Sequence, residues 1–269
     1  MKLTTKIATI AVFTIGLSGI VSPLVSASST QNNVTEASNV QSTPKIKNTF
    51  HSLLASDIAV QLGKTTEDRF TAEDAAKITS LVIKPGVTTF KGVNQLVNLE
   101  QLFYAGGSVK SIDLSANKKL KHLALVHGQM TKLNISANDN LVSLSINDNL
   151  LKTLDLTNNV KLKSLQASSN RLKMLDFSKN SELNSISLDN NLLTNLDVTS
   201  NKQLQMLWAY NNKIKEIDLS KNNQLTMLSL DNNALKTLDL SQNKSLIFAS
   251  AANNPGVATG AIQELYRTY

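Results

Sequence analysis

LQMLWAYNNKIKEIDLSKNNQ, residues 204–224, has close copies on both sides of itself in the chain. The copy before it is LNSISLDNNLLTNLDVTSNKQ (183–203), and the copy after it is LTMLSLDNNALKTLDLSQNKS (225–245). Apolar residues, asparagine and aspartate recur in register, but Trp208 and Tyr210 stand where both neighbours have serine and aspartate. The shared residues indicate a repeated structure. The only tryptophan of the chain departs from the repeat, and that departure needs a reason.

The repeat extends well beyond these three copies. Its pattern is L-x-x-L-x-L-x-x-N-x-L-x-x-L-D-L-S-x-N-x-x, which matches the leucine-rich-repeat signature at the short end of its length range. Nine consecutive units keep this register without an insertion, and chance would not hold the spacing for so long. The 21-residue units begin at Ile78, Leu99, Leu120, Leu141, Leu162, Leu183, Leu204, Leu225 and Leu246.

The first part of each unit predicts a short strand. Leu228 and Leu230 alternate with polar residues, so a strand turns these two side chains inward and points their neighbours outward. One unit cannot bury its own leucines, but stacked units share a continuous core. We therefore predict an α/β solenoid, a leucine-rich-repeat horseshoe with a concave parallel β-sheet and a helical N-terminal cap.

Asparagine recurs at the ninth position of six units. We expect its side chain to turn inward at the bend and bond backbone groups, because buried backbone polar groups need partners. The first three units carry glycine there, so the turns at the N-terminal end must be built differently. The ninth-position residues are Gly86, Gly107 and Gly128, followed by Asn149, Asn170, Asn191, Asn212, Asn233 and Asn254.

Lysine and aspartate form two further columns, at the twelfth and fifteenth positions. Viewed alone, the lysines resemble a stripe that binds nucleic acid or another polyanion. Beside an equally regular aspartate column they indicate a solvated and largely neutralised flank, so we expect no nucleic-acid partner. The lysines are Lys110, Lys152, Lys173, Lys215 and Lys236, and the aspartates are Asp113, Asp155, Asp176, Asp197, Asp218 and Asp239.

The start of the chain predicts export. Lys2 and Lys6 precede the apolar run IATIAVFTIGLSGIVSPLV, and small residues precede a cleavage site after Ala27, which is the pattern of a secretory signal peptide over residues 1–27. A membrane anchor is the alternative, and Pro23 and the cleavage site disfavour it. We expect a secreted, extracellular protein with no stable membrane insertion after signal cleavage. Cleavage of the signal peptide removes these two lysines and lowers the net charge from +7 to +5. The remaining positive charge favours weak association with an anionic cell wall.

Shorter segments flank the repeats. Residues 28–49 are polar and predict a flexible leader. Residues 50–77 predict the helical N-terminal cap, 78–260 the leucine-rich repeats, and 261–269 an amphipathic C-terminal tail or cap. The chain has no cysteine, so we expect burial and hydrogen bonds alone to hold it together.

The cap resembles that of a known family. Its residues are similar, in order and spacing, to the cap-to-repeat junction of the internalins, surface and secreted proteins of Gram-positive bacteria. The resemblance covers about residues 50–105 and implies a curved solenoid whose concave sheet binds a protein, often a host receptor, without catalysis. The chain departs from the family in that its repeats are one residue shorter and are followed only by Gly260 to Tyr269. It also has no sorting motif of the LPxTG type. These departures favour a small secreted member of the wider group. The matching residues are Leu62-Gly63-Lys64, Asp68, Thr71, Asp74 and Ile78-Thr79-Ser80-Leu81.

The sequence offers poor candidates for catalysis, and we expect no enzyme, cofactor or metal site. His122 and His127 share one unit, but no third ligand joins them. Asp189 and Asp231 occupy the same outward column two units apart, near the carboxyl separation of an inverting glycosidase. On an open sheet we expect nothing to desolvate these acids and raise their pKa. A wall-directed protein that binds or hydrolyses glycan or another polyanion is the alternative to a protein-binding module.

The outward strand positions supply the binding prediction. Small polar residues of the middle units give way to large apolar ones in the later units, and exposed patches of this kind mark interaction sites. The alternatives are that the tail, with Tyr266 and Tyr269, covers the patch or that the protein self-associates through it. We expect a protein ligand, with a host cell-surface or envelope protein as the candidate. The predicted contacts are Met206, Trp208, Tyr210, Met227 and Phe248, with Asp189 and Asp231 at the rim and a smaller patch at Phe103, Ala105 and Val126.

Overall fold

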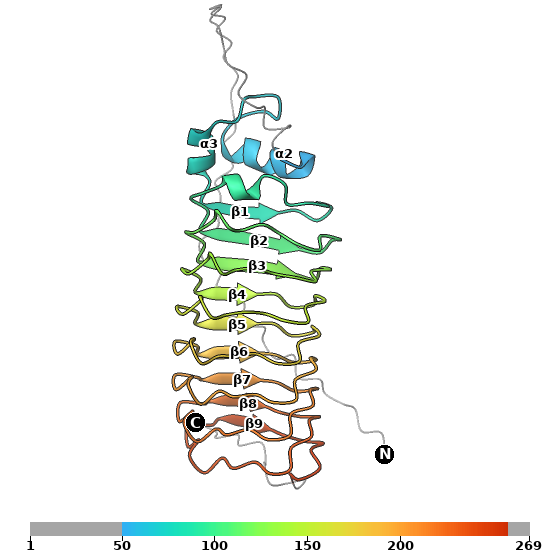
Figure 1. The fold of residues 1–269 in the computed structure, drawn as a ribbon, viewed down its shortest axis with the longest axis vertical. Helices are drawn as coiled ribbons and strands as arrows, with labels where there is room; N and C mark the ends of the chain where they lie inside the picture. The colour runs from blue at the N-terminus through green and yellow to red at the C-terminus, as the bar shows by residue number, and fades with distance from the viewer. Residues whose placement is uncertain (1–49, 258–269) are drawn as a thin grey trace, which may run out of the picture. The chain divides into compact units, whose positions relative to one another are not determined.

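Nine short strands form one parallel sheet in the part of the chain that the structure describes (Figure 1). The computed structural model describes residues 50–257, so the predicted signal peptide, leader and C-terminal tail lie outside the described residues. Each strand pairs with the strand of the next unit, 21 residues further on. The strands are β1 (Ser80–Ile83), β2 (Gln101–Ala105), β3 (His122–Val126), β4 (Ser143–Ser145), β5 (Ser164–Gln166), β6 (Ser185–Ser187), β7 (Met206–Trp208), β8 (Met227–Ser229) and β9 (Phe248–Ser250).

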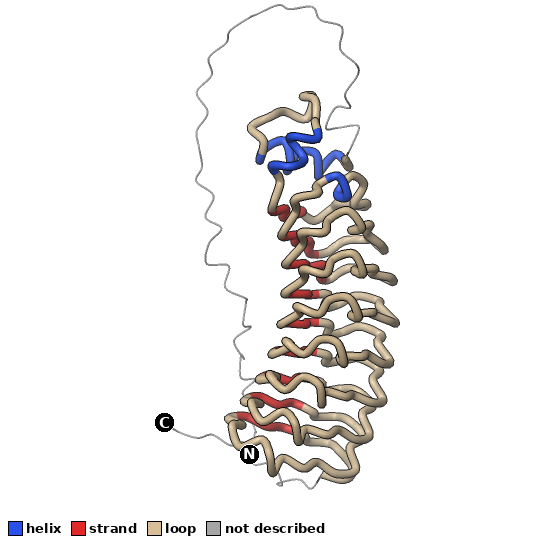
Figure 2. The backbone as a smooth tube through the Cα atoms, turned by 60° about the vertical axis from the view of Figure 1, so that its left-hand side comes forward, coloured by secondary structure: helices blue, strands red, loops and turns tan. Residues whose placement is uncertain are grey.

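The core lies between this sheet and the loops that return from one strand to the next. Leu207 and Ala209, at the fourth and sixth positions of their unit, are fully buried, as the alternation predicts. Figure 2 shows the strands along one side of the stack and loops along the other. From residue 96 to residue 257 these returns are turns and irregular segments without a helix. The helical part of the fold is therefore confined to the N-terminal end of the described region.

Two α-helices and a short 3₁₀-helix lie at the β1 end of the stack (Figure 1). They are α2 (Ser52–Gln61), α3 (Ala72–Lys77) and η1 (Val93–Gln95). Helix α2 contacts β1, and Leu54 and Ile58 are fully buried in the same core as the repeats. Within residues 50–257 no helix has the length and apolar character that crossing a membrane requires.

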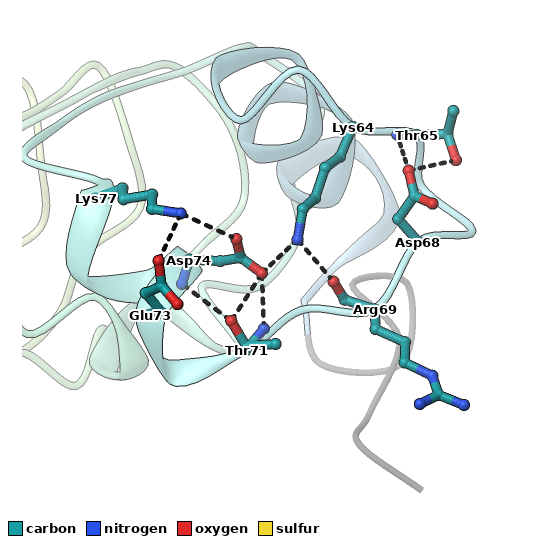
Figure 3. A network of polar contacts seen from close by, with 8 residues as sticks. All are labelled: Lys64, Thr65, Asp68, Arg69, Thr71, Glu73, Asp74 and Lys77. Carbon is teal, nitrogen blue, oxygen red and sulfur yellow. Dashed lines mark hydrogen bonds and ion pairs between the residues drawn. The ribbon is translucent and has the colours of Figure 1, made fainter. Parts of the chain in front are cut away.

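Polar contacts hold the turn between α2 and α3 (Figure 3). Thr71 and Asp74 form a capping box, in which the Asp74 backbone N–H donates to the Thr71 hydroxyl and the Thr71 N–H donates to the Asp74 carboxylate at 2.9 Å. Lys64 Nζ reaches the same carboxylate at 2.6 Å. Burial acts to raise the pKa of Asp74, but the bonds from Lys64 and Thr71 together outweigh it and lower that pKa. The residues that carry the internalin resemblance thus fix the junction between the helices.

The ninth-position asparagines turn inward and bond the backbone, as predicted. Asn191 Oδ1 accepts from the Leu172 N–H at 3.0 Å, and its Nδ2 donates to the carbonyl of Ala167 at 2.9 Å and of Leu188 at 3.0 Å. The earlier turns are indeed built differently. The Tyr104 hydroxyl donates to the Val87 carbonyl at 3.0 Å, and the neighbouring turn has its glycine, Gly107, at a φ of 119°.

A second buried asparagine column stands at the nineteenth position, and sequence reasoning assigned it no role. Each of these side chains donates from Nδ2 to carbonyls 24 and 21 residues earlier, as Asn201 does to Phe177 at 3.3 Å and Asn180 at 2.8 Å. The two columns therefore link successive units through side-chain bonds at two places in every unit. The members are Asn117, Asn138, Asn159, Asn180, Asn201, Asn222 and Asn243.

The fifteenth-position aspartates serve the turns rather than the lysines. Asp218 Oδ1 accepts from the Ser220 N–H at 2.8 Å, and this bond and that of the Ser220 hydroxyl lower the Asp218 pKa. Asn134 takes the same place in its own unit and accepts from the Ser136 N–H at 3.0 Å. An asparagine thus makes the same turn without a charge.

Replacing Asn191 with alanine is expected to lower the free energy of unfolding by about 1–3 kcal/mol, because it leaves several buried backbone groups without partners. Asn223→Ala is the matched control, since Asn223 is an exposed asparagine of a neighbouring unit. Urea denaturation followed by circular dichroism measures both variants. An Asn191→Ala midpoint equal to that of the control would contradict the structural role of the ninth position.

Candidate interaction surface

Side chains at the third, fifth and seventh positions of the units lie on the side of the strands opposite the core, and we call their surface the sheet face. Over β4 to β6 the sheet face consists mainly of small hydroxyl and amide side chains. Ser145 Oγ, for example, donates to Gln166 Oε1 of the next strand at 3.1 Å. Large side chains replace some of these residues over β7 to β9, while Ser229 and Ser250 keep the fifth positions of their units. The change of surface chemistry coincides with the units that hold the predicted ligand-binding residues.

Five large side chains lie on these three strands or directly after them, and we call them the aromatic–methionine cluster. Register places three of them side by side at the third position. All five are half-buried rather than freely exposed, whereas Met174 elsewhere on the chain is 75% exposed. The predicted apolar patch therefore exists as a partly covered surface. Its members are Met206, Trp208, Tyr210, Met227 and Phe248.

Trp208 lies on β7 at the outward position between Met206 and Tyr210, in register with Ser187 and Ser229. Its indole nitrogen Nε1 is buried, and no group within the described residues accepts its hydrogen. A buried indole N–H normally finds an acceptor, so an unpaired one costs stability.

Asp189 overturns the prediction that both acids lie in the open at a rim. The side chain is only 4% exposed. Its carboxylate accepts from the Ser168 hydroxyl and from the Tyr210 N–H, each at 3.2 Å. Burial raises the pKa of Asp189 to about 6, against the lowering effect of these bonds. The prediction failed because an outward strand position was equated with exposure, although larger residues of the next unit stand beside this carboxylate.

Asp231 is half-buried and is held in a similar way. Its Oδ1 accepts from the Ser250 hydroxyl at 2.5 Å and the Ala252 N–H at 2.6 Å, and Ser229 Oγ lies 3.4 Å from Oδ2. Asp231 therefore remains the more accessible of the two predicted rim acids.

Phe103 lies far from the cluster. It stands on β2 in register with Val82, which is 55% exposed, and with Ala124. Five strand spacings of roughly 4.8 Å separate β2 from β7, which is about 24 Å. The structure therefore does not join Phe103 to Trp208, and two separate apolar regions flank a polar middle.

The two histidines of the third unit lie on β3 and in the turn after it. His127 Nδ1 lies 2.9 Å from Asp148 Oδ2 of the next unit, and both side chains are exposed. His122 stands on the sheet face at the third position. Among residues 50–257 no three histidine, aspartate or glutamate side chains gather as metal ligands would.

An exposed asparagine row at the eighth position was also missed by sequence reasoning. Asn211 Nδ2 donates to Asn190 Oδ1 at 2.8 Å, and the same bond continues from Asn232 and from Asn253 at 2.7 Å each. All four have φ between 54° and 57°, in the left-handed region that asparagine tolerates better than most residues. The run of Asn-Asn pairs was the signal, and it places an amide row beside the seventh-position side chains.

One short parallel strand per 21-residue unit, with asparagine columns beside the core, defines a leucine-rich-repeat solenoid. Internalin structures from Listeria monocytogenes are similar to it. The similarity to InlC2 has a TM-score of 0.69 at 22% identity, over 80% of this chain and all of that one. For the functional domain of InlJ, which includes a cysteine ladder, the TM-score is 0.54 at 24% identity, over 79% of this chain and 57% of that one.

A likeness also extends to the complex of TLR13 with ssRNA13, with a TM-score of 0.51 at 21% identity over 64% of this chain and 28% of that one. At these identities the similarities show the fold alone. A scan against protein-family models gave no match, and neither did a search of curated proteins.

Proposed function

We propose that this chain is a secreted protein-binding module whose sheet face holds a protein ligand around Trp208. The observation that carries the proposal is the aromatic–methionine cluster, which interrupts a serine-rich face over three consecutive strands. Tryptophan, tyrosine and methionine are the residue types enriched at the centres of interfaces. The unpaired indole N–H of Trp208 supports the proposal, because a ligand that shifts the ring would relieve its cost.

Export is part of the proposal and rests on residues 1–27, which have the charge and apolar pattern of a signal peptide. The ligand's identity as a host or envelope protein follows only from the likeness to internalins. Nucleic acid is a poorer candidate, although TLR13 binds RNA on a similar fold. The outward positions of β4 to β9 contain no lysine or arginine, the side chains that neutralise phosphates.

Replacing Trp208 and Tyr210 together with serine is expected to weaken ligand binding at least tenfold, about 1.4 kcal/mol, without loss of the fold. Serine already occupies the equivalent position beside Trp208 in both adjacent strands, so the sheet tolerates it. The ligand is first isolated with the wild-type protein from surface proteins, and its dissociation constant is then measured for both proteins.

Circular dichroism and the melting temperature serve as the controls for this double variant. Normal ligand binding by a folded double variant would contradict the proposed function. Unfolding would also contradict it, because the two aromatic side chains would then be structural.

A wall-directed hydrolase is the second candidate, and the raised pKa of Asp189 favours it, since a general acid needs such a pKa. Against it, the Asp189 side chain is 4% exposed and so has little surface for a substrate. Incubation of the purified protein with peptidoglycan distinguishes the candidates, because release of soluble fragments would favour the hydrolase.

A further inference from the structure

Over β4 to β9 the sheet face carries a charge opposite to that of the whole chain. The chain has a net charge of +7. Over β4 to β9, however, the third, fifth and seventh positions hold two carboxylates and no lysine, arginine or histidine. These carboxylates are Asp189 and Asp231, and they stand in one row on either side of Tyr210. Two carboxylates therefore stand beside the aromatic–methionine cluster, on a part of the sheet face that has no cationic side chain.

Neither carboxylate is neutralised within the described residues. Asp189 and Asp231 accept from hydroxyl groups and backbone N–H groups, which stabilise a negative charge without cancelling it. Aspartates elsewhere do receive a cation, as Asp57 does from Lys84 at 2.7 Å. A counter-charge for the sheet face must therefore come from outside the described residues.

The electric field of Asp189 extends to the side chain of Tyr210. Burial is the main cause that raises the pKa of Tyr210, and the charge of Asp189 is the second. The groups that flank Asp189 in its row are Ser168 and Tyr210, and Asp231 follows one unit further on. A cation placed against Tyr210 would consequently feel both carboxylates and the face of an aromatic ring.

We propose that the cluster accepts an arginine or lysine side chain of the protein ligand, set between apolar residues that cover Met206, Met227 and Phe248. This proposal rests on the proposed function and adds the chemistry of the partner. Asp231 is half-buried and contacts the cation directly, whereas Asp189 acts on it through its electric field. A paired and desolvated charge of this kind supplies specificity, because a neutral side chain at the same place leaves the carboxylates unpaired.

Trp208 provides the measurement, since it is the only tryptophan of the chain. The purified full chain is titrated with acetyl-Phe-Arg-Leu-amide and with its citrulline analogue, which has the same shape and no charge. Binding is followed by tryptophan fluorescence and by the indole N–H signal in nuclear magnetic resonance. We expect the arginine peptide to bind about tenfold more tightly at pH 7.5 and low salt, with the preference reduced in high salt and at pH 5.

Three variants assign the preference to residues. Asp231→Asn is expected to bring the two affinities close together, and Asp189→Asn to weaken the preference and remove its dependence on pH. Asp218→Asn is the matched control, because it removes one negative charge from a turn in which Asn134 of another unit makes the same bond. This variant should keep the preference for the arginine peptide.

Equal affinities of the wild-type protein for the two peptides, or no response of Trp208 to either, would overturn the cation site, and this comparison requires no variant. An Asp231→Asn protein with an unchanged preference would also overturn it. The proposed function is tested separately, because the Trp208 and Tyr210 double variant is measured with the isolated ligand and not with these peptides.

Discussion

Deletion of residues 50–77 is expected to yield a protein that aggregates or remains unfolded. Leu54 and Ile58 of α2 are fully buried in the common core, and α2 contacts β1. Without them the inward side chains of β1, Leu81 and Ile83, would face water at the open end of the stack. Stability in a solenoid is a sum of unit and neighbour terms, so an uncovered end exposes apolar surface and starts unfolding.

A pair of substitutions on α2 tests the same point without shortening the chain. Leu54→Asp with Ile58→Asp places two charges in the core and should have the effect of the deletion. Val60→Asp on the same helix is the control, because Val60 is 75% exposed. Far-ultraviolet circular dichroism and size-exclusion chromatography measure all three proteins. A monomeric deletion variant with the wild-type spectrum would show that residues 50–77 do not close the core.

Much of this fold could be predicted from the repeat alone. The 21-residue period sets the strand register, because every unit must present its leucines to the same core as its neighbours. The Thr71 capping box and the inward turn of Asn191 follow from local rules about unpaired backbone groups. The nineteenth-position asparagines were equally regular in the sequence, but a polar residue near the end of a unit does not reveal by itself whether it is buried.

The candidate site was only partly predictable. Comparison of the units located Trp208 and Tyr210, since departures from a repeat stand out against the common pattern. It could not predict the burial of Asp189, because strand alternation gives the direction of a side chain but not the size of its neighbours in the next unit. The separate place of Phe103, on β2 of the same face, follows from the repeat register and was predicted.

Asp189→Asn is expected to stabilise the free protein at neutral pH. Burial raises the pKa of Asp189 from 3.8 to about 6, a shift of roughly two units, which corresponds to about 3 kcal/mol at full ionisation. Below about pH 4 the carboxyl is protonated in both states and this cost is absent. Between pH 4 and 6 the unfolded chain releases its proton first, so the folded state loses stability as pH rises, and above pH 6 the loss is complete.

Asparagine cannot ionise, and its side-chain oxygen can still accept the bonds from Ser168 and Tyr210. We therefore expect the variant to gain about 1–3 kcal/mol in the free energy of unfolding at pH 7.5 and little or nothing at pH 4. Urea titrations followed by Trp208 fluorescence report on the neighbouring unit directly. Asp218→Asn removes the same charge from a group whose pKa is lowered rather than raised, so it should bring no gain at neutral pH.

A gain for Asp189→Asn that is equal at both pH values, or a loss at pH 7.5, would show that the buried charge is not destabilising. A carboxylate that costs the free protein stability, and that asparagine could replace without that cost, is best explained by a role outside the fold. A cationic side chain of the ligand would lower the pKa of Asp189 on binding, so part of the stability that the free protein lacks would appear as affinity.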